Sequence, residues 1–134
     1  MQWSPGAHAG FSPPATESTW LPVHPNHLLT NVETEMNDPG SRLALYRRLL
    51  RLRRVNPALH SGAVEVQPSV SEVVAYRRSH TEGEPFVIAA NLSNVEVKHA
   101  ADGEVVVSNN HELEGRPYRG ELEPWEAVVV RPDA

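Results

Sequence analysis

The stretch between residues 38 and 59 constrains the fold of this 134-residue chain most strongly. It is rich in leucine, alanine and arginine, which favour the α-helix. Asp38 and Ser41 stand at its start, where their side chains can accept hydrogen bonds from the free N–H groups of a first turn. Asn56 precedes Pro57 at its end, and a residue before proline is driven out of the helical conformation. The sequence therefore predicts one helix of about four turns.

This predicted helix has two chemically different faces. At about 100° per residue, one half of its circumference is apolar and the other half is basic. The apolar half holds Leu43, Leu45, Tyr46, Leu49, Leu50 and Leu52, and the basic half holds Arg47, Arg48, Arg51 and Arg54. Burial of the apolar side chains would contribute on the order of 10 kcal/mol at most. The helix therefore needs a partner surface, supplied either by this chain or by another.

The arginine-rich face does not predict a nucleic-acid-binding protein. The net charge is −5 at pH 7, and no aromatic platform accompanies the arginines, so a solvated basic face is the simpler interpretation. The chain has no cysteine, no apolar run long enough to span a membrane, and no N-terminal signal pattern. We therefore expect a cytoplasmic protein with neither a nucleic-acid partner nor a membrane partner.

Residues 1–37 read as an irregular segment with five prolines. Neither a helical nor a strand period persists there, and an irregular loop of this length is uncommon in a compact domain unless it is functional or disordered. Trp3, Phe11 and Trp20 argue against disorder, because disordered segments contain few such residues. We predict an ordered loop that lies on another surface.

Residues 60–134 read as a series of short strands separated by polar turns. The predicted strands are 63–67, 72–78, 86–92, 95–99, 104–108, 118–122 and 125–131. Their spacing is typical of an antiparallel β-sandwich. The fold class is therefore mainly β, with three predicted parts: the loop 1–37, the helix 38–59 and the sandwich 60–134.

Catalytic chemistry is hard to find in the residues themselves. Glycosidases need two carboxylates across a cleft, but the acidic pairs here are spaced i, i+2, which places their members on opposite faces of a strand. Those pairs are Glu33/Glu35, Glu82/Glu84, Glu112/Glu114 and Glu121/Glu123. His24 and His27 stand close together without a third ligand nearby, so no zinc site is expected. We expect no metal, no cofactor and no catalytic residue in this chain.

Several short runs nevertheless resemble a known family. They are Met1-Gln2-Trp3-Ser4-Pro5, Ala9-Gly10-Phe11-Ser12, Trp20-Leu21-Pro22-Val23-His24-Pro25-Asn26, Asn31-Val32-Glu33, Asn91-Leu92-Ser93 and Leu122-Glu123-Pro124-Trp125-Glu126-Ala127. The chain is similar to the C-terminal part of α-glucosidases of glycoside hydrolase family 13, the α-amylase clan, which includes oligo-1,6-glucosidases, maltases and trehalose synthases. The sequence departs from that pattern at Thr19, His24 and His27, where the family usually has Pro, Asn and Tyr.

The resemblance implies a structural place for each part. Residues 1–37 would form the active-site rim of a (β/α)8 barrel, the helix would be the last barrel helix, and the sandwich would be the C-terminal domain. The family acts on α-glucosidic oligosaccharides by retaining hydrolysis or transfer, without a cofactor. Gln2 and Trp3 would lie nearest the sugar. The family's catalytic carboxylates lie on earlier barrel strands, so we expect this chain to be a fragment that is not catalytic by itself.

Two other functions remain open. The chain could be a stand-alone sandwich that binds carbohydrate or protein, which an exposed aromatic platform would indicate. We predict instead that Trp125, the one tryptophan of the sandwich, lies in the core. The chain could also complete a barrel encoded separately. In either setting the apolar face of the helix 41–55 could bind a barrel partner or cause self-association, since we expect this chain to lack the barrel strands that would cover it.

Overall fold

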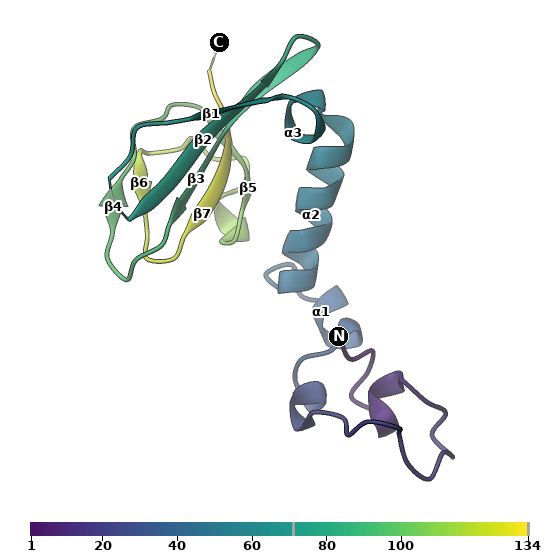
Figure 1. The fold of residues 1–134 in the computed structure, drawn as a ribbon. Coiled ribbons are helices and arrows are strands. Elements are labelled where there is room, and N and C mark those ends of the chain that lie inside the picture. The colour runs from purple at the N-terminus through teal and green to yellow at the C-terminus, as the bar shows by residue number, and fades with distance from the viewer. Residues whose placement is uncertain (71, 134) are drawn as a thin grey trace. The chain divides into compact units, whose positions relative to one another are not determined.

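The computed structural model describes residues 1–70 and 72–133 (Figure 1). The chain divides into two compact units, Met1–Ala44 and Leu45–Ala134. Helices are few, and most of the regular secondary structure of the second unit consists of antiparallel strands. The predicted mainly β, antiparallel fold is therefore confirmed.

The first unit contains more helix than the sequence indicates. Its elements are the 3₁₀ helices η1 (Ala7–Gly10) and η2 (Pro25–Leu28), the helix α1 (Val32–Met36) and the start of the helix α2 (Arg42–Val55). The prediction of an irregular segment up to residue 37 is wrong for α1. Asn31 explains this helix, because its Oδ1 accepts from Thr34 N at 2.9 Å and its Nδ2 donates to the His27 carbonyl at 2.8 Å. A fully buried cap of this kind starts a helix without any apolar period.

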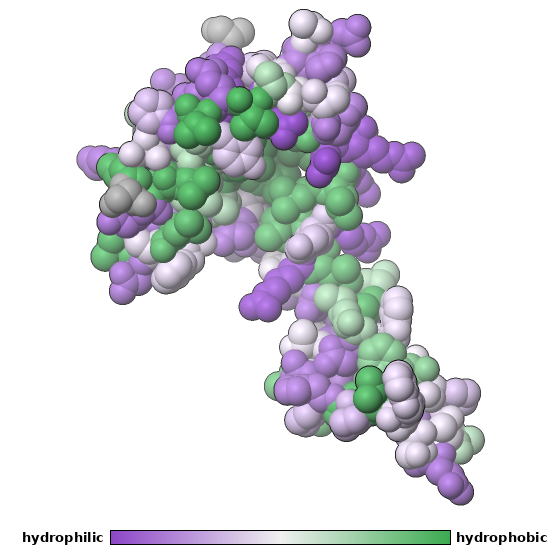
Figure 2. All heavy atoms as spheres, viewed as in Figure 1, coloured by the Kyte–Doolittle hydropathy of each residue, from purple (hydrophilic) through white to green (hydrophobic). Residues whose placement is uncertain are grey.

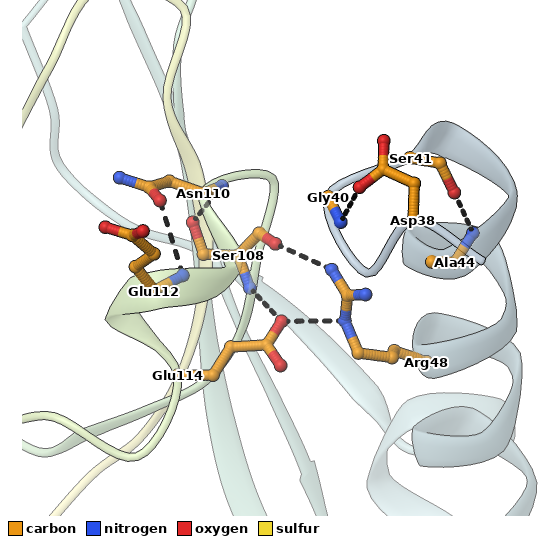
Figure 3. Close-up of polar contacts among 9 residues, drawn as sticks. All are labelled: Asp38, Gly40, Ser41, Ala44, Arg48, Ser108, Asn110, Glu112 and Glu114. Carbon is orange, nitrogen blue, oxygen red and sulfur yellow. Dashed lines mark hydrogen bonds and ion pairs between the residues drawn. The ribbon is translucent and has the colours of Figure 1, made fainter. Parts of the chain in front are cut away.

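The long helix α2 begins at the capping residues that the sequence indicates (Figure 3). Ser41 Oγ accepts from Ala44 N at 3.1 Å, and Asp38 Oδ1 accepts from Gly40 N at 2.8 Å in the preceding turn. Glu35 adds a carboxylate that accepts from Leu43 N at 3.0 Å. The first turn of α2 therefore has acceptors for its free N–H groups and a favourable negative charge.

The end of α2 is fixed by Asn56 and by the following short helix α3 (Pro57–His60). Asn56 Nδ2 donates to the Leu52 carbonyl at 2.7 Å, and Pro57 begins α3. Arg78 then binds the C-terminal end of α3, where its Nε donates to the Ala58 carbonyl at 3.0 Å. Its Nη2 donates to the Gly62 carbonyl at 3.1 Å. The guanidinium of Arg78 therefore links α3 and Gly62 to strand β2.

Within residues 45–70 and 72–133, the second unit contains seven strands in two sheets. They are β1 (Ala63–Val66), β2 (Val73–His80), β3 (Gly83–Asn91), β4 (Val97–Lys98), β5 (Glu104–Ser108), β6 (Glu121–Leu122) and β7 (Ala127–Arg131). Five of them form an antiparallel sheet in the order β1-β2-β3-β7-β5, and β4 pairs with β6. β3 is central and buries Phe86, Val87 and Ala89, as its continuous apolar run predicts. The second layer of the sandwich is thus only a two-stranded sheet.

Each face of the five-stranded sheet carries its own apolar cluster. One face carries a cluster in which Leu122 of β6, from the second layer, packs on the five-stranded sheet. Its members on that sheet include Val87, Ala89, Val105, Val128 and Val130. On the other face Phe86, Val107 and Val129 pack with Ala58 of α3, and Leu45, Leu52 and Leu59 lie against them. α2 and α3 therefore cover part of the sheet within this unit.

These contacts correct two expectations about α2. Leu45 and Leu52 find their partner surface in this chain, whereas Tyr46 and Leu50 stay 68% and 61% exposed. Arg48 was expected on the solvated face, and this is wrong. Its Nε lies 2.9 Å from Glu114 Oε1, and that oxygen also accepts from Ser108 N at 3.1 Å (Figure 3). The helix turns this arginine toward the sandwich because a carboxylate there neutralises it.

Three buried polar groups lie beside the first cluster. Among the described residues, His99 Nδ1, Tyr118 Oη and Glu126 Oε1 are buried without a hydrogen-bond partner. The rings of His99 and Tyr118 have centroids 6.4 Å apart. Burial lowers the pKa of His99 below its ordinary value of 6.5. Burial, together with the charges of Glu126 and Glu121, raises the pKa of Tyr118 to about 12.

The stability of the sandwich should therefore fall at both ends of the pH scale. As the pH drops below 6.5, the unfolded chain binds a proton at His99 that the folded chain binds less readily. As the pH rises above 10, the unfolded chain loses the Tyr118 proton while the folded chain keeps it up to about pH 12. The measurement is Tm against pH for the wild type and for His99→Leu. The Tm difference should move in favour of the variant below pH 6.5, and a difference that does not change with pH would contradict the role of His99.

Candidate functional site

The backbone of Gln2 and Trp3 is fixed by hydrogen bonds within the first unit. The carbonyls of Gln2 and Trp3 accept from Val32 N at 2.9 Å and from Glu33 N at 3.1 Å, at the start of α1. Trp3 N donates to the Ala9 carbonyl at 2.9 Å. These bonds hold the first residues of the chain as an ordered segment, although Trp3 remains 57% exposed. The main chain of both predicted site residues is therefore fixed within this unit.

The turn that receives Trp3 has an unusual backbone. His8, Ala9 and Gly10 have φ values of 56°, 52° and 75°, in the left-handed region. A Cβ at Gly10 would lie 2.9 Å from Trp3 Cβ, so glycine is required there both by conformation and by space. His8 supports the turn, because its Nε2 donates to the Thr16 carbonyl at 2.7 Å. Strain of this kind persists only where the surrounding contacts enforce it, and it is common at functional sites.

The side chain of Gln2 belongs to a small polar network. Gln2 Nε2 donates to Asn26 Oδ1 at 2.7 Å, and His24 Nδ1 lies 2.7 Å from the same oxygen. His24 Nδ1 is also 3.2 Å from Asn26 N. A protonated Nδ1 donates to Asn26 Oδ1, whereas an unprotonated Nδ1 accepts from Asn26 N. The tautomer of His24 therefore decides which of the two bonds forms.

Beside this network lies a surface hollow of about 570 Å3. It is lined by Met1, Gln2, Phe11, Ser12, Thr19, Trp20, Leu21, Pro22, Val23 and His24. Trp20 is 94% exposed there. Apolar rings, one amide and one imidazole are groups that bind a polar ligand with apolar faces, such as a sugar. The structure brings Gln2 to this hollow but not Trp3.

Sequence reasoning named Gln2 and Trp3 and missed their neighbours. His24, Asn26 and Trp20 stand about twenty residues away in the sequence, and their only signal was the proline-flanked run in which they occur. The contact between Gln2 and Asn26 depends on η2 and on the Asn31 cap, neither of which has a strong pattern. No local rule predicts such a contact.

Three glutamates hold structural elements together through their carboxylates. Glu35 accepts from Leu43 N, Glu114 pairs with Arg48, and Glu126 Oε2 accepts from Glu123 N at 2.8 Å. Within residues 1–70 and 72–133, no group of three His, Cys, Asp or Glu side chains could hold a metal ion. None of the helices in the described part of the chain has the length and apolar character needed to cross a membrane.

The position of Trp125 differs from the prediction. The sequence predicts this side chain in the core, but it is 61% exposed. Its φ of 61° lies in the left-handed region and interrupts the alternation of the strand, so β7 starts only at Ala127. The turn is held firmly, because Trp125 N donates to the Ser93 carbonyl at 3.1 Å. Asn109 Nδ2 donates to the Trp125 carbonyl at 2.9 Å.

The chain is similar to known proteins both in sequence and in fold. Residues 1–62 match the α-amylase family, in its catalytic domain. The chain is 35% identical over 133 residues to the glucan 1,6-alpha-glucosidase of Streptococcus dysgalactiae subsp. equisimilis, covering 98% of this chain and 24% of that protein. It is 29% identical over 140 residues to the oligo-1,6-glucosidase of Parageobacillus thermoglucosidasius, covering 98% of this chain and 24% of that protein.

Solved structures of similar fold also match nearly the whole chain. The trehalulose synthase MutB of Pseudomonas mesoacidophila MX-45 superposes with a TM-score of 0.81 at 28% identity, covering 98% of this chain and 24% of that chain. A MutB mutant in complex with the substrate sucrose gives a TM-score of 0.82 at 28% identity and the same coverage. This chain thus spans about a quarter of the length of the proteins that it matches. In sequence and in fold, the chain belongs to glycoside hydrolase family 13, the α-amylase family, and is α-glucosidase-like.

Proposed function

We propose that this chain forms the last part of a family 13 catalytic barrel together with the C-terminal β-domain of the same enzyme. In that enzyme residues 1–37 are the rim of the sugar site, residues 38–59 are the last barrel helix, and residues 60–134 are the C-terminal sandwich. The enzyme hydrolyses or transfers α-glucosidic bonds in oligosaccharides with retention of configuration. The chain alone is not catalytic. The cytoplasmic location expected from the cysteine-free sequence is part of this proposal.

One observation carries the proposal for the rim. Gln2 and Trp3 are held by the start of α1 through their main chain, and the side chain of Trp3 is 57% exposed and therefore accessible to a ligand. Gln2 is further oriented by Asn26 beside a hollow with exposed aromatic rings. An ordered amide next to aromatic rings suits a glucose ring, which offers hydroxyl groups at its edge and C–H groups on its faces.

A segment exchange tests this proposal. This chain replaces the aligned 133 residues of the Streptococcus dysgalactiae glucan 1,6-alpha-glucosidase, and the product is called the exchanged enzyme. We expect it to release glucose from isomaltose oligosaccharides. Gln2→Ala or Trp3→Ala should then lower kcat/KM by roughly tenfold to a hundredfold, the effect of one lost binding or positioning contact.

The matched control is Leu29→Ala, which removes an apolar side chain that is 80% exposed in the same unit. It should leave kcat/KM unchanged. An exchanged enzyme that folds but has no activity would contradict the proposed function. Equal losses from Leu29→Ala and Trp3→Ala would contradict the role of the rim residues.

The exposed Trp125 favours a second candidate, a sandwich that binds carbohydrate. Its indole is 61% exposed on a strained but firmly bonded turn. Such a ring can stack on a glucose face, with a contribution of about 1 kcal/mol. We expect quenching of tryptophan fluorescence by isomaltose oligosaccharides in the isolated chain if this candidate holds. Trp125→Ala should then abolish the response, whereas Leu50→Ala, which removes an apolar side chain of the second unit that is 61% exposed, should not.

A further inference from the structure

His24 makes a contact that requires a proton at one particular nitrogen. Its Nδ1 lies 2.7 Å from Asn26 Oδ1 and 3.2 Å from Asn26 N. An amide oxygen carries no hydrogen, so the shorter contact is a hydrogen bond only when Nδ1 is protonated. With an unprotonated Nδ1 the two lone pairs would repel each other at 2.7 Å, and the Asn26 side chain would have to rotate away. A proton on Nδ1 therefore holds the Asn26 side chain in place.

Asn26 transmits this effect to Gln2. Gln2 Nε2 donates to the same Asn26 oxygen at 2.7 Å, and within the described residues this bond orients the Gln2 amide. Rotation of Asn26 would remove the acceptor and release the amide. Gln2 keeps its Oε1 and one N–H for a ligand, and it lines the hollow of about 570 Å3 together with His24. Figure 2 shows hydrophobic and hydrophilic residues side by side on the surface of the first unit.

Few other titratable groups act on His24. No ion pair joins it to a carboxylate within residues 1–70 and 72–133. His27 Nδ1 donates to the His24 carbonyl at 3.0 Å, and it can do so whether its ring is neutral or charged. The amino group of Met1, which lines the hollow, is replaced by a peptide bond in the exchanged enzyme. His24 is therefore the group whose protonation changes this network.

We propose that His24 is a positioning residue of the sugar site, which acts on Gln2 through Asn26 and makes sugar binding depend on pH. This inference rests on the proposed function. Histidine changes its charge between about pH 5 and pH 8. At the acid end of this range the imidazolium carries a proton on Nδ1, so Asn26 and Gln2 are held and the site binds sugar best. At the alkaline end the neutral ring can carry its single proton on Nε2 instead, and the Gln2 amide is no longer fixed.

The test compares His24→Asn with the wild-type sequence in the exchanged enzyme. Asparagine does not titrate, but its side-chain oxygen can still accept from Asn26 N at the start of η2. At about pH 5.5, KM for isomaltose oligosaccharides should be about three to ten times higher in His24→Asn than in the wild type, the effect of one hydrogen bond. At about pH 8 the two KM values should be equal. The kcat ratio should not change with pH, since uniform binding affects KM alone.

Two controls accompany this comparison. His60→Asn makes the same change at an exposed histidine of α3 and should follow the wild type at both pH values. In an Asn26→Ala background, His24→Asn should change KM less than about twofold at either pH, because the two residues act as one pathway. The isolated chain gives a readout that needs no catalysis. There the NMR signal of the Gln2 side-chain amide should shift between about pH 5 and pH 8 in the wild type but not in His24→Asn.

The outcomes separate the role of His24 from the proposed function. A KM ratio that is the same at both pH values, or a full effect of His24→Asn in the Asn26→Ala background, would overturn the role of His24. An inactive exchanged enzyme would contradict the proposed function. The amide signal of the isolated chain then decides the link between His24 and Gln2: a shift that His24→Asn removes supports it, and a signal that does not change with pH overturns it.

Discussion

Gly103→Ala should lower the free energy of unfolding of the second unit more than any other glycine substitution that we propose. Gly103 has a φ of 141°, and an added Cβ would collide with the carbonyl oxygen of Arg131 and lie 2.8 Å from Pro132 Cα. Both obstacles are backbone atoms next to the edge of the sheet, so they cannot rotate away. The Gly103 carbonyl also accepts from Tyr118 N at 2.7 Å, which prevents the turn from moving outward. Strain and overpacking together should cost about 3–5 kcal/mol, against a total stability of about 5–15 kcal/mol for a domain.

The matched control for this variant is Gly115→Ala. Gly115 also has a positive φ, of 79°, but no heavy atom lies within 4 Å of the added Cβ. This variant should therefore lose only about 1 kcal/mol, the cost of a left-handed non-glycine residue. Urea denaturation followed by circular dichroism measures both free energies of unfolding. Equal losses at the two glycines would mean that backbone conformation, rather than the collision with Arg131 and Pro132, sets the requirement for Gly103.

The features that the sequence predicted well depend on neighbouring residues. The helix α2 follows from its capping residues and its leucine period, and the central position of β3 follows from a continuous apolar run. The turn at Gly103 follows from Ala101-Asp102-Gly103, since glycine tolerates the conformation that the turn requires. In each case the physical cause lies within a few residues in the chain, so a local pattern carries it.

The features that it missed depend on partners distant in the sequence. Arg48 leaves the solvated face of α2 because Glu114 stands 66 positions further along the chain. Trp125 leaves the core because Asn109 and Ser93 hold its turn in a left-handed conformation. The contact of Gln2 with Asn26 joins two loops that have no period at all. The fold class was therefore accessible from the sequence, whereas the side chains around the candidate site were not.

The isolated chain should release glucose from isomaltose oligosaccharides no faster than the buffer does. Retaining hydrolysis needs two carboxyl groups about 5 Å apart, one as nucleophile and one as acid. In the described residues Glu35, Glu114 and Glu126 are instead bound to Leu43 N, to Arg48 and to Glu123 N. The rate should therefore lie at least about a millionfold below that of the exchanged enzyme, the lower end of enzymatic rate enhancements.

The measurement is glucose release by micromolar purified chain, with the exchanged enzyme assayed in parallel. Glu35→Gln and Glu126→Gln serve as controls, because each keeps the size of the side chain and removes a carboxylate. Activity that persists through purification and disappears with one of these substitutions would contradict the prediction, since it would place a catalytic carboxylate in this chain. Inactivity of the chain beside activity of the exchanged enzyme would instead assign the carboxylates to the other part of the enzyme, and would leave to this chain the rim, the last helix and the C-terminal sandwich.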